Sequence, residues 1–147
     1  MKLFLLGIIM SLSLISAQDT ETISQQIITL EKAALQRWTN GDPTGFLEIY
    51  AEDIVYFDPF LAIRMDGINA ITKYYNNGAG KIFAERFELL NPYVQTDGKL
   101  AVLTFNYVSY KGNTTSKWNC TEVYRLEDSG WKICQSHWSL TQPFKGK

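Results

Sequence analysis

The stretch from Gly41 to Phe60, "GDPTGFLEIYAEDIVYFDPF", joins a helix start to a strand that ends in an acidic residue. Asp42 can cap a helix and Pro43 suits the first helical position, which predicts a short helix through "GDPTGFLEIYAED". Its apolar face would consist of Phe46, Leu47 and Tyr50. Residues 54–58 predict a short strand, and Pro59 ends it because proline cannot continue a hydrogen-bonded ladder.

Asp58 closes this strand among the rings of Tyr56, Phe57 and Phe60. A carboxylate is costly to desolvate unless it has a partner or the site uses it. One interpretation is a structural turn, since an aspartate before proline commonly accepts hydrogen bonds from backbone N–H groups just beyond it. The other is a general base in a pocket, with its pKa raised by the neighbouring rings. Tyr56 shares a face with Asp58, so its hydroxyl can donate to a ligand oxygen.

Two further helices flank this stretch. From Ile23 to Trp38, apolar residues recur at helical spacing, Glu31 falls mostly away from their face, and Gly41 ends the helix. After the strand, "DGINAITKYYNNG" predicts a third short helix, with Asp66 as its cap and Asn77-Gly78 as its end.

The C-terminal half changes to a period of two, which is typical of strands. Four segments show it, joined by the turns "TDG", "KGNTT" and "EDSG": 83–90, 99–110, 116–126 and 131–140. Helices followed by long antiparallel strands predict an α+β fold. The sheet must bend strongly around the three helices for both sets of apolar residues to be buried.

The register of the last two strands decides which side chains share a face. Pairing Leu126 with Trp131 across "EDSG" puts Cys120 opposite His137 and places the two cysteines on opposite faces. A disulfide needs Cα atoms within about 7 Å. The sequence therefore predicts that Cys120 and Cys134 are free, mostly buried thiols.

The first 17 residues predict a secretory signal peptide. Lys2 supplies the charge, residues 3–15 form an apolar run too short to span a bilayer comfortably, and Ser16-Ala17 supplies small residues for cleavage. We therefore expect a secreted or periplasmic protein, with residues 18–147 forming a single domain. No second apolar stretch follows, so no membrane association is expected after cleavage.

Charge and composition narrow the function. Of the 14 basic residues only Lys2 lies in the signal, so the remainder has 13 against 15 acidic residues, a formal charge of −2. No basic patch stands out, which argues against a nucleic-acid partner. No His/Cys/Asp cluster has metal-ligand spacing, and neither cysteine has a basic neighbour that would activate it. We expect no metal and no cofactor.

Glu122 is the second acidic candidate. The same register gives it a face shared with Trp118, Tyr124, Ile133, Gln135 and His137, which is less polar than a solvated face. Two carboxylates at one cavity would push their pKa values apart, so that one stays protonated as a donor. The alternative is an ion pair of Glu122 with Arg86 or Arg64.

Two further polar residues are candidates. His137 is the only histidine and can move protons near neutral pH, although a lone histidine on a strand is more often a satisfied core or rim residue. Asn106 would point inward if Phe105 and Tyr107 pack outward.

Three segments carry a family resemblance: "WTNGDPTGFLEIYAEDIVYFDPF", "MDGINAITKYY" and "GWKICQSHWSL". They resemble the nuclear-transport-factor-2-like superfamily, and most closely its SnoaL-like and ketosteroid-isomerase-like branches. The resemblance implies a cone-shaped sheet closed over by three helices, a pocket at the wide end, and usually a homodimer. It implies Asp58 as general base and Glu122, three residues before Arg125, as the acid that holds an enolate. The tyrosine that completes this site is Ala34 here, which argues against steroid-type enolisation.

These observations lead to two functional hypotheses. The first is a pocket for a small sugar-derived or other oxygenated molecule, in an isomerase, dehydratase or lyase that needs no cofactor. Its catalytic residues would be Asp58, Glu122 and His137, and its ligand-binding residues Tyr56, Asn106, Trp118 and Gln135. The second is a non-catalytic binding or association module with a vestigial pocket, in which outward Phe105 and Tyr107 form the dimer or partner surface.

Overall fold

The computed structural model describes residues 3–141, with side chains described from residue 19 onward. Its elements in chain order are α1 (Leu3–Thr39), α2 (Thr44–Leu47), β1 (Tyr50–Phe57), β2 (Met65–Asp66), α3 (Ile68–Gly78), β3 (Arg86–Thr96), β4 (Leu100–Lys111), β5 (Thr114–Glu127) and β6 (Gly130–Leu140). The α+β class predicted from the change of period is confirmed.

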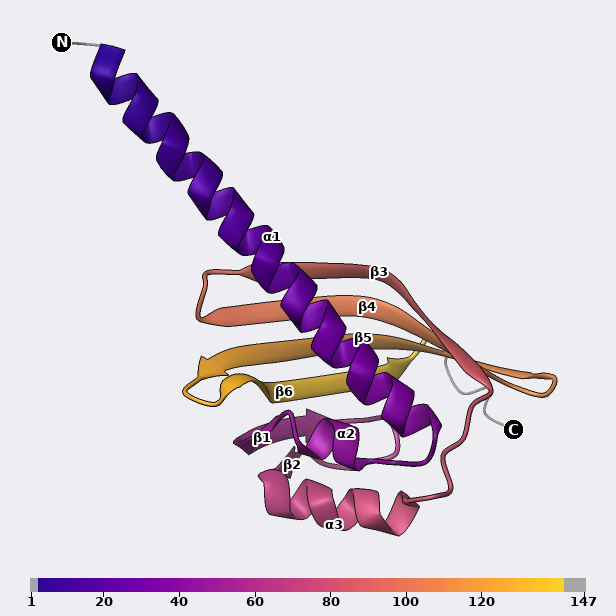
Figure 1. Ribbon diagram of the computed structural model, residues 1–147. Coiled ribbons are helices and arrows are strands. Elements are labelled where there is room, and N and C mark those ends of the chain that lie inside the picture. Colours follow the sequence, from indigo (N-terminus) through magenta and orange to yellow (C-terminus); the bar gives the residue numbers. More distant parts are fainter. Residues whose placement is uncertain (1–2, 142–147) are drawn as a thin grey trace.

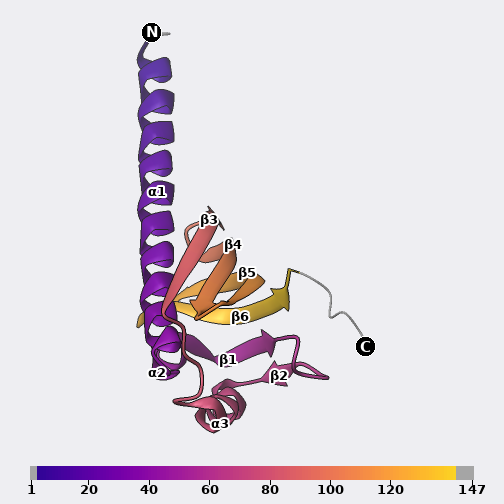
Figure 2. The same ribbon diagram turned by 90° about the vertical axis from the view of Figure 1, so that its right-hand side faces the viewer.

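The strands form one six-stranded sheet in the order β2-β1-β6-β5-β4-β3. β1 runs parallel to β6, and the other neighbouring pairs are antiparallel. The sheet is curved and does not close. α1 lies against one face of it, and α3 packs beside β1 and β2 (Figures 1 and 2).

The core fills the space between α1 and the sheet face that it covers, which we call the inner face. Ile27 and Leu35 of α1 are buried there with Leu103 of β4 and Ile133 of β6. A helix with one apolar stripe and a sheet with one apolar face bury each other's surface, which is the main stabilising contribution in such a two-layer domain. The opposite face of β3–β6 is called the outer face below.

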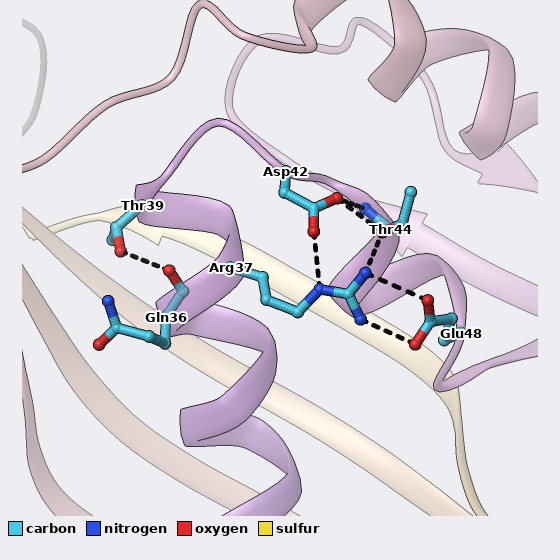
Figure 3. Close-up of polar contacts among 6 residues, drawn as sticks. All are labelled: Gln36, Arg37, Thr39, Asp42, Thr44 and Glu48. Carbon is cyan, nitrogen blue, oxygen red and sulfur yellow. Dashed lines mark hydrogen bonds and ion pairs between the residues drawn. The ribbon is translucent and has the colours of Figure 1, made fainter.

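The corner between α1 and α2 is held by one arginine (Figure 3). Arg37 donates to Asp42 at 2.7 Å and to Glu48 at 2.8 and 3.1 Å, and its guanidinium also contacts the Thr44 hydroxyl. Gly45 allows this approach, because a Cβ there would lie 2.9 Å from the Cβ of Arg37. The corner fixes the direction in which the chain enters β1.

The sequence pattern placed several element boundaries wrongly. The second helix is a single turn that ends at Leu47, and β1 begins at Tyr50. Pairing with β6 overrides local helix preference here, since the Ile133 N–H donates to the Ile49 carbonyl at 2.7 Å. The cap of α3 is Gly67 rather than Asp66, whose carboxylate pairs with Arg64.

A β-bulge decides the faces of β6. Leu126 does pair with Trp131, as predicted, but the register shifts between Tyr124 and Val123, which leaves Cys134 as an extra residue. Beyond the bulge, Cys120 therefore faces Trp138 rather than His137. Both cysteines are free, as predicted, with Cys120 buried and Cys134 half-buried.

The N-terminal part of α1 extends past the sheet (Figure 1). The helix runs without a break from Leu3, and among the side chains described from residue 19 onward the first buried one is Ile27. Within residues 3–141, no helix combines the length and apolar character that crossing a membrane requires.

Candidate functional site

A cavity of about 900 Å³ opens at one end of the inner face. It is bounded by α1, by the chain that follows β1, by α3, by the connector of residues 79–84, and by the paired ends of β4 and β5. Its walls are rich in aromatic rings, among them Trp38, Phe46, Tyr75, Tyr107, Trp118 and Trp138. A cavity of this size and lining is typical of a small-molecule site.

Asp58 is the only acidic side chain among the described residues that line this cavity. Its Oδ1 accepts a hydrogen bond from the Phe60 N–H at 2.7 Å, which is the structural turn expected before Pro59. Its Oδ2 accepts from the hydroxyls of Tyr56 and Tyr74, each at 3.1 Å. The structural turn is therefore confirmed at Oδ1, while Oδ2 is held by two phenols at the cavity.

The phenols around Asp58 stay protonated at neutral pH. Burial raises the pKa of Tyr56 well above its usual value, and the neighbouring Tyr75 and Asp58 raise it further. Partial burial and the Asp58 charge raise the pKa of Tyr74 to about 12. Both hydroxyls consequently act as donors that orient the carboxylate.

The hydroxyl contacts continue from Asp58 into the core. Tyr56 is hydrogen-bonded to Tyr75, and the Tyr75 and Tyr50 hydroxyls lie 2.9 Å apart. Tyr50 and Tyr75 are both buried, and their rings are tilted by 48° with centroids 6.1 Å apart. This row of tyrosines makes the wall behind Asp58 rigid.

Glu122 is buried but does not line the cavity. It accepts a hydrogen bond from the Ser136 hydroxyl at 2.9 Å and a weaker one from the Cys120 thiol at 3.6 Å, and it is hydrogen-bonded to Trp138. Neither expected arginine contacts it, since Arg64 pairs with Asp66 and Arg86 with Glu88. The expectation that Asp58 and Glu122 face one cavity is therefore wrong: Glu122 is enclosed by its own donors.

Glu31 of α1 is the neighbour of Glu122 in the core. Its Oε2 accepts a 2.5 Å hydrogen bond from the Tyr124 hydroxyl, and burial raises its pKa to about 7. Burial, followed by the charge of Glu31, raises the pKa of Glu122 well above its usual value. Glu31 Oε1 and Glu122 Oε2 are buried without a hydrogen-bond partner. Two such groups hold protons more tightly than exposed carboxylates do.

Three predicted site residues lie on the outer face. The bulge at Cys134 turns Gln135 and His137 away from Glu122, so both are exposed, and His137 contacts the Phe57 ring with centroids 5.5 Å apart. Asn106 faces outward and donates to Asn119 at 2.9 Å, because its neighbours Phe105 and Tyr107 pack inward. The expected inward positions of these three residues, and the expected outward positions of the two aromatics, are wrong.

Sequence reasoning missed Tyr74 and Glu31. Tyr74 follows Ile71 by three residues on α3, the spacing that places two side chains on neighbouring parts of one helix face. Glu31 lies four residues after Ile27 and four before Leu35, both of which are buried, so helical spacing alone assigns it to the apolar stripe. Of the predicted ligand-binding residues, Tyr56 and Trp118 do line the cavity.

The described residues do not form a metal centre. Within residues 3–141, no group of three or more His, Cys, Asp or Glu side chains is arranged to hold a metal ion. Among the described residues, the cavity lining includes one carboxylate, the phenols that contact it, two lysines and several aromatic rings.

Comparisons with known proteins identify a matching family and similar solved structures. Residues 32–135 match the profile of the SnoaL-like domain. No curated protein sequence matches the chain. Among solved structures, a protein from Parabacteroides distasonis, described as a "putative ketosteroid isomerase", is 40% identical with a TM-score of 0.75. That match covers 84% of this chain and 91% of the other.

Two other solved structures share the architecture. A protein of unknown function from Pseudomonas putida, described as NTF2-like, is 25% identical over 85% of this chain and 91% of its own, with a TM-score of 0.75. The CaMKII hub of S. rosetta is 20% identical over 80% and 95%, with a TM-score of 0.67, and shows a likeness of fold alone.

Proposed function

This chain belongs to the SnoaL-like domain family, within the nuclear-transport-factor-2-like superfamily, and from that premise we propose that it binds a small oxygenated molecule and transfers a proton on it. Asp58 is the general base, and the reaction is an isomerisation, a dehydration or a related elimination. The observation that carries the proposal is the placement of one oriented carboxylate in a large aromatic cavity.

The geometry around Asp58 leaves one position for a substrate. An ionised carboxylate offers about four acceptor directions. Three of them are taken by Phe60, Tyr56 and Tyr74. The remaining direction can accept a proton from a C–H or O–H group of a bound molecule, and the two phenols hold the carboxylate while it does so.

A steroid-type oxyanion site is not part of the proposal. The position of its tyrosine is Ala34, which is buried, and Glu122 already satisfies Ser136, Cys120 and Trp138. The substrate oxygen must instead be held by other donors that line the cavity, because the single protons of the Tyr56 and Tyr74 hydroxyls are donated to Asp58. An oxygenated substrate, such as a sugar derivative, fits this arrangement better than one that needs a dedicated oxyanion hole.

The test combines binding with proton exchange. A panel of hydroxy- and keto-acids and sugar derivatives is screened by thermal shift, and each stabilising compound is incubated with the protein in D₂O. Mass spectrometry then measures deuterium incorporated at carbon. Asp58→Asn should lower that exchange by about 10²–10⁴-fold, the usual contribution of a general base, while the compound still stabilises the variant.

Glu52→Gln is the matched control, because Glu52 is an exposed acidic residue on the same strand and does not line the cavity. It should leave exchange unchanged. If compounds stabilise the protein and none exchanges, the domain is a binding module and the catalytic proposal fails.

We also propose that the protein is exported. The support for this proposal is the sequence pattern of the first 17 residues, a single basic residue followed by an apolar run and the small residues Ser16 and Ala17. Fractionation of the native host, followed by N-terminal sequencing of the protein, tests this. A chain that keeps Met1 in the cytoplasm would contradict it.

A second copy of the chain is the proposed partner. The outer face carries three exposed apolar side chains, Phe57 at 38%, Leu90 at 39% and Tyr93 at 62%, beside the Asn106–Asn119 contact. Exposed apolar patches of this kind often mark interfaces. Sedimentation of the wild type and of Tyr93→Glu should give a dimer and a monomer, respectively. A wild-type monomer would end this proposal.

A further inference from the structure

Two lysines line the same cavity as Asp58. Lys81 comes from the connector between α3 and β3, and Lys111 from the end of β4. The Lys81 ammonium donates to the Asn77 carbonyl at 2.8 Å. No ion pair among residues 19–141 involves either lysine. Two cations thus belong to a cavity whose only described acidic lining residue is Asp58.

The backbone brings both lysines to the hairpin end of the cavity. The Glu85 N–H donates to the Tyr110 carbonyl at 2.8 Å, which ties the connector to the residue before Lys111. Glu85, which comes just before β3, accepts from the Gly112 N–H at 3.2 Å and does not line the cavity. Its carboxylate is therefore directed at the hairpin backbone rather than into the cavity.

Asp58, which follows β1, lines a different part of the cavity from the two lysines. Phe60, two residues after Asp58, contacts the Trp118 ring with centroids 5.9 Å apart. Trp118 lies on β5, and Lys111 pairs with Thr114 of that strand. The four residues from Trp118 to Thr114 span about 13 Å of extended strand. The acidic and cationic ends of the cavity are separated by roughly this length.

The wall between the two ends is apolar and partly open. Phe60 is 64% exposed, Phe83 55% and Ile82 38%, and all three line the cavity. Large apolar side chains that are exposed inside a concave site are surface that a ligand would cover. Hydroxyls of Ser109, Thr114 and Ser116 accompany the cationic end.

We propose that the ligand is an amphipathic organic anion. Its acidic group lies at Lys81 and Lys111, its ring-containing apolar body covers Phe60, Ile82 and Phe83, and its oxygenated carbon lies at Asp58. This inference rests on the proposed function, because it requires that the cavity bind a small molecule. It adds a charge and a length to the substrate class.

A pair of fluorescent probes tests it. 8-Anilinonaphthalene-1-sulfonate and N-phenyl-1-naphthylamine share one ring system, and only the first carries a sulfonate. The anionic probe should bind once per chain and more tightly than the neutral one. The double variant Lys81→Met/Lys111→Met should lower its affinity by roughly tenfold, as expected for the loss of two partly exposed ion pairs, and leave the neutral probe unchanged.

Lys73→Met is the matched control, because Lys73 is exposed on α3 and does not line the cavity. It should change neither affinity. Added salt should lower the affinity of the wild type for the anionic probe more than it lowers the affinity of the double variant. Thermal melting of each variant confirms that it folds, and Lys111→Met alone serves if the double variant melts early.

The outcomes separate this inference from the proposed function. Equal wild-type affinities for the two probes, with no effect of the lysine substitutions, would overturn the choice of an anion and leave the cavity as a binding site. A failure of both probes to bind would overturn this inference, whereas the exchange assay on the panel compounds still decides the proposed function. If Asp58→Asn loses proton exchange but still binds the anionic probe, the result supports both the proposed function and this inference.

Discussion

Asp58 and the Glu31–Glu122 pair are acidic sites in one small domain, and their surroundings give them different properties. Asp58 lines a cavity and is held by two phenols and a backbone N–H. Glu31 and Glu122 are fully buried, each with one oxygen that has no partner. The comparison teaches that a carboxylate is available for chemistry when its donors orient it and leave one direction open. A carboxylate enclosed in the core acts on stability instead.

The largest expected effect is the dependence of stability on pH. Burial raises the pKa of Glu31 from 4.5 to about 7, so the folded state binds more protons than the unfolded state in this range. Stability is therefore full below about pH 4.5 and falls as the pH rises through 7. The loss for Glu31 alone is about 3 kcal/mol, and the raised pKa of Glu122 adds to it in the same direction. Urea denaturation at pH 5 and pH 8.5 measures the difference.

Glu31→Gln sharpens this test. Glutamine keeps an acceptor for the Tyr124 hydroxyl and removes the titration, so the variant should lose less stability between the two pH values than the wild type does. A wild-type stability that rises between pH 5 and pH 8.5 would contradict the assignment.

Tyr56→Phe should have the next largest effect. The Tyr56 side chain is 5% exposed, and its hydroxyl donates to Asp58 and is hydrogen-bonded to Tyr75. A buried hydrogen bond to a charged group is worth about 1.5–3 kcal/mol. Chemical denaturation at pH 7 should show a loss of that size, together with slower proton exchange on any substrate. A variant with wild-type exchange would show that Tyr56 does not position the base.

Tyr74→Phe is the milder counterpart. Its hydroxyl makes the same 3.1 Å contact with Asp58, but from a half-buried position. Removing the hydroxyl should cost about 1 kcal/mol or less, because water can replace it. The melting temperature should fall less than in Tyr56→Phe. A larger fall in Tyr74→Phe would contradict the idea that the more buried hydroxyl contributes more to stability.

The smallest effect is expected for His137→Ala. His137 is exposed on the outer face and touches Phe57 rather than either acidic site. Surface substitutions of this kind usually change stability by less than about 0.5 kcal/mol. Proton exchange and its pH profile should match the wild type. A large loss of exchange would return His137 to the catalytic site.

Much of the fold and part of the site follow from local patterns. The helical spacing from Ile27 to Leu35 and the alternation in the last strands predict the α+β class, and the superfamily resemblance is confirmed. The Asp58–Pro59 pair predicts the turn that the Phe60 N–H completes. These features depend on neighbours within a few residues, so the sequence contains the information needed for them.

The sequence by itself determined the helical and extended segments, the turn at Asp58 and the aromatic character of the residues around it. Only the tertiary structure decided which side chains look into the cavity. One extra residue at Cys134 moves Gln135 and His137 to the outer face, because side chains along a strand alternate with a period of two. Likewise, Glu31 and Glu122 meet only because α1 packs across the sheet, where the Tyr124 hydroxyl of β5 reaches Glu31, a long-range contact that no local pattern records.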